Sequence, residues 1–154
     1  MLHVLFVCEH NSARSQMAEA FLKHLGSEAF TAESCGLVAG TLNPLVVEVM
    51  AEIGYDLHGK TTQAALDLFR EGRSYDVVIT VCSQKASEGC PLFPGRALRY
   101  NWPFADPSRI EGDRETQLAA IRKIRDQIKL QIEAFIAEYN QKGLKMFLSV
   151  EPIA

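Results

Sequence analysis

Three residues near the N-terminus, Cys8, Arg14 and Ser15, have the spacing of an anion-binding site that contains a nucleophile. Cys8 ends an apolar run, and Arg14 and Ser15 follow where an amphipathic segment begins. A tight loop between a strand and a helix leaves backbone N–H groups unpaired, and these groups attract anions. The same positive field favours a thiolate over a thiol. The pattern therefore predicts a loop that binds an oxyanion and attacks it with sulfur.

The polar side chains of this loop have distinct predicted roles. The Arg14 guanidinium is a planar, permanently charged donor that matches a tetrahedral oxyanion. Ser15 is placed to donate a hydrogen bond to the sulfur, and Asn11 suits a left-handed backbone position. The alternative is a structural cysteine at a strand end and an arginine exposed on a helix. The predicted substrate-binding residues are Glu9, His10, Asn11, Ser12, Ala13 and Arg14.

Short apolar runs alternate with amphipathic segments along the chain. This alternation predicts a single-domain α/β fold, a four-stranded parallel sheet flanked by helices on both faces. The sequence pattern predicts strands over 2–7, 28–34, 76–81 and 97–102. It predicts helices over 13–25, from Thr61 or Thr62 to Gly72, and over about 114–140. A further predicted helix is capped by Asn43-Pro44 and runs through Ile53, with the Ile53 side chain facing inward.

Two cysteines follow predicted buried strands. Ligands of parallel sheets gather at the carboxyl ends of the strands, so Cys8 and Cys82 should share one edge of the sheet. A third thiol, Cys90, is separated from Cys82 by seven residues of a Ser- and Gly-rich stretch. The pair can form a disulfide only if that stretch bends or moves. The alternative is two unrelated thiols. Cys35, after a weaker strand, is predicted to be a small core residue.

An Asp-Pro dipeptide follows the last predicted strand. Proline holds the preceding Asp106 extended, so its carboxyl group is presented from the loop. The alternative is an ordinary Asp-Pro turn.

Composition bounds the class of protein. The length of 154 residues suits one domain, which we expect to span residues 1–140, followed by a tail, 141–154, of unassigned packing. A net charge of −3 argues against nucleic acid or an acidic membrane as partner. No apolar run is long enough for a membrane span, and the cysteines come without an export signal. We expect a cytoplasmic monomer without a tightly bound cofactor.

The segment Cys8–Ser15 resembles the phosphate loop of the low-molecular-weight tyrosine phosphatases. The run from Asn11 to Glu19 is similar to that of their arsenate-reductase relatives, and the resemblance covers residues 1 to about 140. It implies that Cys8 attacks the oxyanion and that Asp106 is the general acid. The phosphatases usually place tyrosine after Asp-Pro, whereas this chain has Ser108-Arg109.

The reductase resemblance also implies a role for the later thiols. Cys82 and Cys90 match a cysteine pair that takes the oxidation from Cys8 as a disulfide and passes it to thioredoxin or a glutaredoxin-type reductant. An arsenic-centred reduction requires two electrons, which a thiol pair supplies. The spacing of the pair is one residue longer here than in the usual pattern, which affects the loop conformation.

In some of these reductases a potassium ion lies beside the loop. The resemblance places its ligands at Asn11, Glu19 and Ser34, with Gln63 in the position of the fourth, an aspartate. Alternatively, Glu19 is a polar helix residue hydrogen-bonded under the loop.

Three functions remain open from the sequence. The first is arsenate reduction through Cys8, Cys82 and Cys90. The second is hydrolysis of aryl phosphates through a Cys8 phosphocysteine, with the other thiols as bystanders. The third is binding of arsenite or zinc by three thiols without turnover. Arg14 and Ser15 argue against the third, because a soft-metal site has little use for anion-binding groups.

Overall fold

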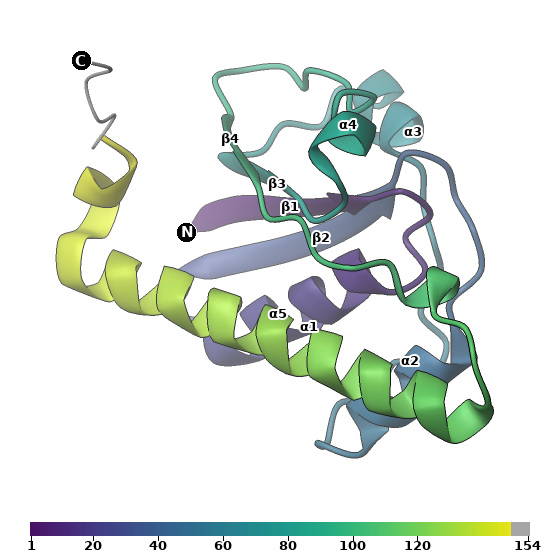
Figure 1. Ribbon diagram of the computed structural model, residues 1–154. Coiled ribbons are helices and arrows are strands. Elements are labelled where there is room, and N and C mark those ends of the chain that lie inside the picture. Colours follow the sequence, from purple (N-terminus) through teal and green to yellow (C-terminus); the bar gives the residue numbers. More distant parts are fainter. Residues whose placement is uncertain (149–154) are drawn as a thin grey trace.

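The computed structural model describes residues 1–148 and consists of a sheet with helices on both faces (Figure 1). Within these residues the sheet has four strands in the order β2-β1-β3-β4, and the paired strands are all parallel. The predicted fold class is therefore confirmed. The strands are β1 (Leu2–Cys8), β2 (Phe30–Gly36), β3 (Val77–Thr80) and β4 (Leu98–Asn101).

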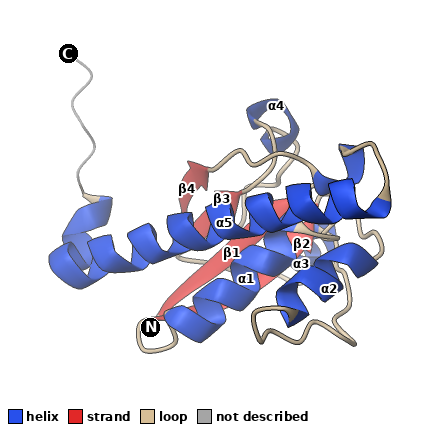
Figure 2. Ribbon diagram, turned by 60° about the horizontal axis from the view of Figure 1, so that its bottom comes forward, coloured by secondary structure: helices blue, strands red, loops and turns tan. Residues whose placement is uncertain are grey.

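The longer helices cover one face of the sheet, as Figure 2 shows, and the shorter ones lie on the other side. The first group comprises α1 (Arg14–Leu25), α2 (Pro44–Ala51) and α5 (Arg114–Lys142). The second comprises α3 (Ala65–Arg70) and α4 (Gln84–Ser87), and two 3₁₀ turns, η1 (Pro107–Arg109) and η2 (Gly143–Phe147), follow later in the chain.

Alternate residues of β1 contribute to two separate cores. Val4 and Phe6 pack with the core of α1, α2 and α5, whereas Leu5 and Val7 pack with the core beside α3. This is the period-2 alternation of a strand that is buried on both faces. All four of these side chains are fully buried, so the strand that ends at Cys8 is held rigidly from both sides.

Two sequence predictions about helices need correction. The third helix starts at Ala65, because residues 61–64 are extended: the Gly36 N–H donates to the Gln63 carbonyl at 2.8 Å and Gly36 bridges Ala64. The second helix ends at Ala51, and Ile53 is 38% exposed instead of facing inward. Its predicted N-cap is confirmed, since the Asn43 side chain accepts from the Leu45 N–H.

The C-terminal part of the chain packs on the α5 side of the sheet. Met146 is buried in that core, and the Phe147 ring lies 6.2 Å from the Phe135 ring, centroid to centroid. Residues 149–154 of the predicted tail lie outside the described residues. Over residues 1–148, no helix combines the length and the apolar character needed to cross a membrane.

Candidate functional site

The loop between β1 and α1 has its carbonyl groups turned outward. The carbonyls of residues 8–12 all accept hydrogen bonds from groups outside the loop. Because the C=O and N–H of a trans peptide point in opposite directions, the following amide N–H groups face the inside of the loop. The result is an anion-binding nest at the N-terminus of a helix. The donors to the carbonyls are the N–H groups of Leu37, Val38, Gly40 and Asn43 and the side-chain amide of Gln16.

The Cys8 side chain lies against the loop backbone, and the residue is only 2% exposed. The Asn11 N–H donates to the Cys8 Sγ at 3.2 Å, and the Ser15 Oγ lies 2.9 Å from the same sulfur. Asn11 has φ of +56°, the left-handed conformation that its residue type predicted. Both contacts set a polar group against the sulfur, which is the kind of environment expected around a reactive cysteine.

Gly36 allows the loop to pack against the end of β2. A Cβ at this position would lie 2.6 Å from the Asn11 backbone nitrogen and 2.4 Å from the Val38 carbonyl oxygen. Contacts this short with backbone atoms would force the loop to shift. Gly36 was not among the predicted site residues, although a glycine at the end of a strand and next to Cys35 is a signal of close backbone approach.

Arg14 lines a cleft at the surface, and the residue itself is only 4% exposed. Its Nη1 donates to the Phe104 carbonyl at 3.1 Å, and this hydrogen bond helps to orient the guanidinium. Its Nη2 lies 3.7 Å from the Asp106 Oδ2 and 3.8 Å from the Glu9 Oε1. These residues line a cleft of about 380 Å³, together with Ser83, Pro103, Ala105 and Arg109. The loop residue Glu9, the arginine and the aspartate therefore come together at one cleft.

Asp106 is an ionised carboxylate in this arrangement. Its burial alone would raise its pKa, but hydrogen bonds from the Ser108 N–H and hydroxyl and the charges of Arg14 and Arg109 outweigh burial and lower the pKa. The Ser108 N–H and Oγ lie 2.9 Å and 2.8 Å from the Asp106 Oδ1. The other oxygen, Oδ2, faces Arg14, and an anion bound to that arginine would reduce the effect of the arginine charge on Asp106.

Cys82 lies beside the loop, as the parallel sheet predicted. Val7 of β1 pairs with Thr80 of β3, and the Val81 N–H donates to the Val7 carbonyl at 2.8 Å. Burial raises the pKa of the Cys82 thiol to about 11, the Arg14 charge lowers it, and Cys8 raises it further. The strand ends thus place a second, protonated thiol within electrostatic range of the first.

Cys90 packs in the core on the other face of the sheet. It is 7% exposed and belongs to the apolar cluster that contains Cys35 and Phe93, whereas Cys8 belongs to the α1 core. Burial raises the pKa of Cys90, and Arg99 partly offsets the rise. All four cysteines are free thiols. The structure therefore brings Cys8 and Cys82 together and keeps Cys90 apart from Cys8.

The other predicted loop residues differ in their exposure. His10 is exposed, Glu9 and Ser12 are partly buried, and Ala13 is buried. The Gln16 side chain was not predicted to be functional, yet its Nε2 donates to the Asn11 carbonyl and to the Thr61 carbonyl. It ties the loop to the segment before α3.

A larger pocket than the Arg14 cleft lies at the other end of the strands. It measures about 740 Å³ and adjoins the start of β1, β3 and β4, with Leu2, Val77 and Leu98 in its wall. It is mainly apolar and contains no cysteine. Since catalytic ligands of parallel sheets bind at the carboxyl ends of the strands, the smaller cleft beside Arg14 is the candidate active site.

Known proteins resemble this chain over most of its length. The sequence profile of the low molecular weight phosphotyrosine protein phosphatases matches residues 3–145. "Arsenate reductase" of Shouchella clausii is 38% identical over 133 residues, which cover 86% of this chain and 93% of that protein. "Glutaredoxin arsenate reductase" of Synechocystis sp. is 34% identical over 143 residues, covering 90% and 98%.

A solved structure described as an arsenate reductase in oxidized state superposes with a TM-score of 0.73 at 32% identity, covering 90% of this chain and 98% of that one. The chain is therefore an enzyme that belongs to the low molecular weight phosphotyrosine protein phosphatase family, in which the relatives compared above are named arsenate reductases.

Proposed function

We propose that this protein reduces arsenate to arsenite, with Cys8 as nucleophile and Cys82 and Cys90 as the thiols that take up the oxidation. The observation that carries the proposal is the position of the buried Cys82 thiol next to an anion nest that already holds Cys8. A phosphatase needs only the nest, Arg14 and Asp106, whereas a reductase also needs a second thiol beside the first. The names of the relatives support the same activity.

In the first step the Cys8 thiolate attacks arsenic of dihydrogen arsenate bound against the loop amides and Arg14. An S–As bond forms, one As–O bond breaks, and the departing oxygen takes a proton from Asp106 and leaves as water. Because Asp106 is ionised in the free protein, it must gain this proton as the substrate binds. Arsenic remains pentavalent in the Cys8 adduct.

In the second step the Cys82 thiolate attacks the Cys8 sulfur. The S–As bond breaks and its electron pair stays on arsenic, which becomes trivalent and leaves as arsenite after protonation. The two sulfurs are oxidised by two electrons and form a Cys8–Cys82 disulfide. Cys90 then attacks Cys82, which releases the Cys8 thiolate and forms a Cys82–Cys90 disulfide.

The cycle is completed when a dithiol reductant such as thioredoxin or a glutaredoxin system reduces the Cys82–Cys90 disulfide. The attack of Cys90 on Cys82 requires a movement of the chain, since Cys90 is buried with Cys35 on the opposite face of the sheet from Cys8. We propose that residues 82–95 rearrange so that Cys90 reaches Cys82 and the new disulfide becomes exposed. The short helix α4, 4 residues long with no buried residue, lies within this segment and offers little resistance to unwinding.

Replacing Cys90 by alanine should stop turnover after about one arsenite per protein. The first two steps use only Cys8 and Cys82, so a single equivalent should form at nearly the wild-type rate, and the Cys8–Cys82 disulfide should then persist. Quantifying arsenite in the presence of thioredoxin and its reductase, with mass spectrometry of the disulfide, makes the measurement. Sustained turnover by this variant would refute the relay.

Arsenite release in a single turnover should accelerate with pH. Because burial raises the pKa of Cys82 to about 11, its reactive thiolate fraction should increase up to about tenfold for each pH unit between about pH 7 and 9. Rapid-quench measurement of arsenite from the reduced protein tests this slope. A rate that stays flat over this range would contradict the assignment of Cys82 as the attacking thiol.

A further inference from the structure

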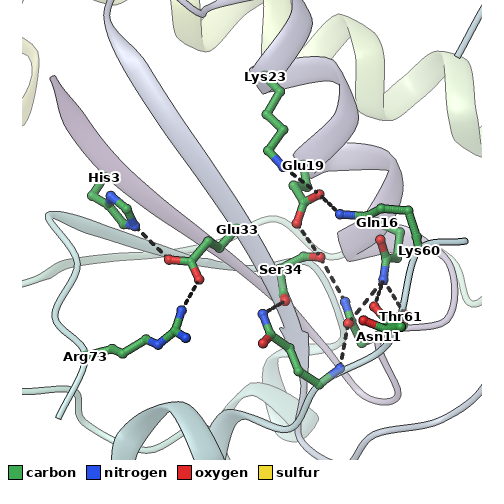
Figure 3. Close-up of polar contacts among 11 residues, drawn as sticks. His3, Asn11, Gln16, Glu19, Lys23, Glu33, Ser34, Lys60, Thr61 and Arg73 are labelled. Atoms are coloured by element: carbon green, nitrogen blue, oxygen red, sulfur yellow. Dashed lines mark hydrogen bonds and ion pairs between the residues drawn. The ribbon is translucent and has the colours of Figure 1, made fainter. Parts of the chain in front are cut away.

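The Cys8 sulfur is connected to a buried carboxylate by a chain of hydrogen bonds. The Ser15 Oγ lies 2.9 Å from the Cys8 Sγ and accepts from the Asn11 Nδ2 at 2.8 Å. The same Asn11 nitrogen donates to the Ser34 Oγ at 3.0 Å, and the Ser34 hydroxyl donates to the Glu19 Oε1 at 3.0 Å. Figure 3 shows the Asn11, Ser34 and Glu19 part of this chain.

The directions of these hydrogen bonds are determined by their two ends. The Asn11 Oδ1 accepts from the Gln63 N–H at 3.1 Å and from Gln16, so the amide nitrogen must face the two serines. Because the Glu19 carboxylate can only accept, Ser34 donates to it and receives from Asn11. Ser15 likewise receives from Asn11, and its own proton is left for the sulfur. The negative charge on Glu19 therefore aligns the chain so that Ser15 stabilises the Cys8 thiolate.

That negative charge is nearly inaccessible to water, since the Glu19 side chain is 7% exposed. A buried carboxylate requires a positive partner. The Lys60 ammonium contacts the Glu19 Oε2 directly, whereas Lys23 lies 3.4 Å away with a side chain that is 55% exposed (Figure 3). Lys60 lies in the segment before α3 and is 33% exposed.

The donor set around Glu19 does not suit a potassium ion. Gln63 turns its Nε2 toward the Ser34 carbonyl, at 2.8 Å, and Asn11 turns its Nδ2 toward Ser34. Both amides thus present hydrogens, which repel a cation, and the remaining carboxylate oxygen is taken by Lys60. Potassium requires oxygen ligands in these positions.

We propose that the Lys60 ammonium is the built-in counter-ion of Glu19 and takes the place of a soluble cation beside the loop. Lys60 is a positioning residue: it touches neither substrate nor sulfur, and it acts by keeping the Glu19–Ser34–Asn11–Ser15 chain aligned on Cys8. Without it, Glu19 either remains as an unneutralised charge or takes up a proton, and a protonated carboxyl group no longer forces Ser34 to donate. Both outcomes weaken the stabilisation of the thiolate.

The test is the rate of Cys8 alkylation by iodoacetamide at fixed neutral pH, followed by mass spectrometry of the Cys8 peptide. It needs no arsenate, so it stands apart from the reductase proposal. Lys60→Met should lower the alkylation rate about tenfold. Loss of a nearby charge shifts an equilibrium between thiol and thiolate by about this factor, and only the thiolate is alkylated. Lys60→Arg, which keeps the charge, should stay within about twofold of wild type.

Lys23→Met is the matched control, since it removes a more exposed ammonium from the same carboxylate, and its rate should change by less than about twofold. The wild-type rate should be equal in potassium chloride and in tetramethylammonium chloride of the same ionic strength. A potassium-dependent wild-type rate, or equal rates for Lys60→Met and Lys23→Met, would overturn the proposal. If Lys60→Met does not fold, Lys60→Arg and the salt comparison still decide it.

Discussion

Replacing Cys82 by serine should abolish arsenate reduction and leave hydrolysis of p-nitrophenyl phosphate intact. The serine hydroxyl cannot attack the Cys8 sulfur, so the Cys8–arsenic adduct has no route to arsenite, and turnover should fall by at least about 10³-fold. Hydrolysis uses the nest, Arg14 and Asp106, none of which depends on a thiol at position 82. Parallel assays of the two reactions on one preparation give the ratio directly.

Cys35→Ala provides the control for this prediction. Cys35 is also a fully buried thiol close to a strand end, and it packs with Leu5 and Val7. Because the proposed relay does not use it, both activities should stay within about threefold of wild type once folding is verified. If Cys82→Ser retains reduction, or loses both activities in parallel, the assignment of Cys82 to the reductive step is wrong.

Replacing Arg14 by lysine should lower kcat/KM about 10²- to 10³-fold for arsenate and for p-nitrophenyl phosphate alike. The guanidinium is oriented by its hydrogen bond to the Phe104 carbonyl. It therefore presents parallel N–H groups to an oxyanion as charge develops. A lysine keeps the charge but cannot reproduce the two-pronged contact. Steady-state kinetics with both substrates measure the loss.

Arg109→Lys is the comparison for Arg14→Lys. Arg109 lines the same cleft and lies 3.6 Å from the Asp106 Oδ2, but its side chain is 78% exposed. An exposed ion pair contributes little, so kcat/KM should change by less than about threefold. Equal losses in the two arginine variants would mean that positive charge at the cleft, and not the buried fork of Arg14, is what the reaction needs.

Periodicity was sufficient to predict most of the fold. The fully buried strands and the long amphipathic helix give strong local patterns, and parallel pairing follows from their alternation. The same reasoning placed Cys8 and Cys82 at one edge, which the pairing of Val7 with Thr80 confirms. Helix propensity misplaced the start of α3, because residues 61–64 instead make long-range bonds to Gly36 and Asn11.

The candidate anion-binding loop could be predicted without coordinates, since Cys8, Asn11, Arg14 and Ser15 are neighbours along the chain and their geometry is local. Which distant groups meet that loop became known from the folded structure alone. Gly36 approaches its backbone, Lys60 neutralises Glu19 beneath it, and Cys90 lies with Cys35 on the far face. Such contacts join segments that no periodic pattern relates, because they depend on how the strands and loops pack in space and not on neighbouring residues.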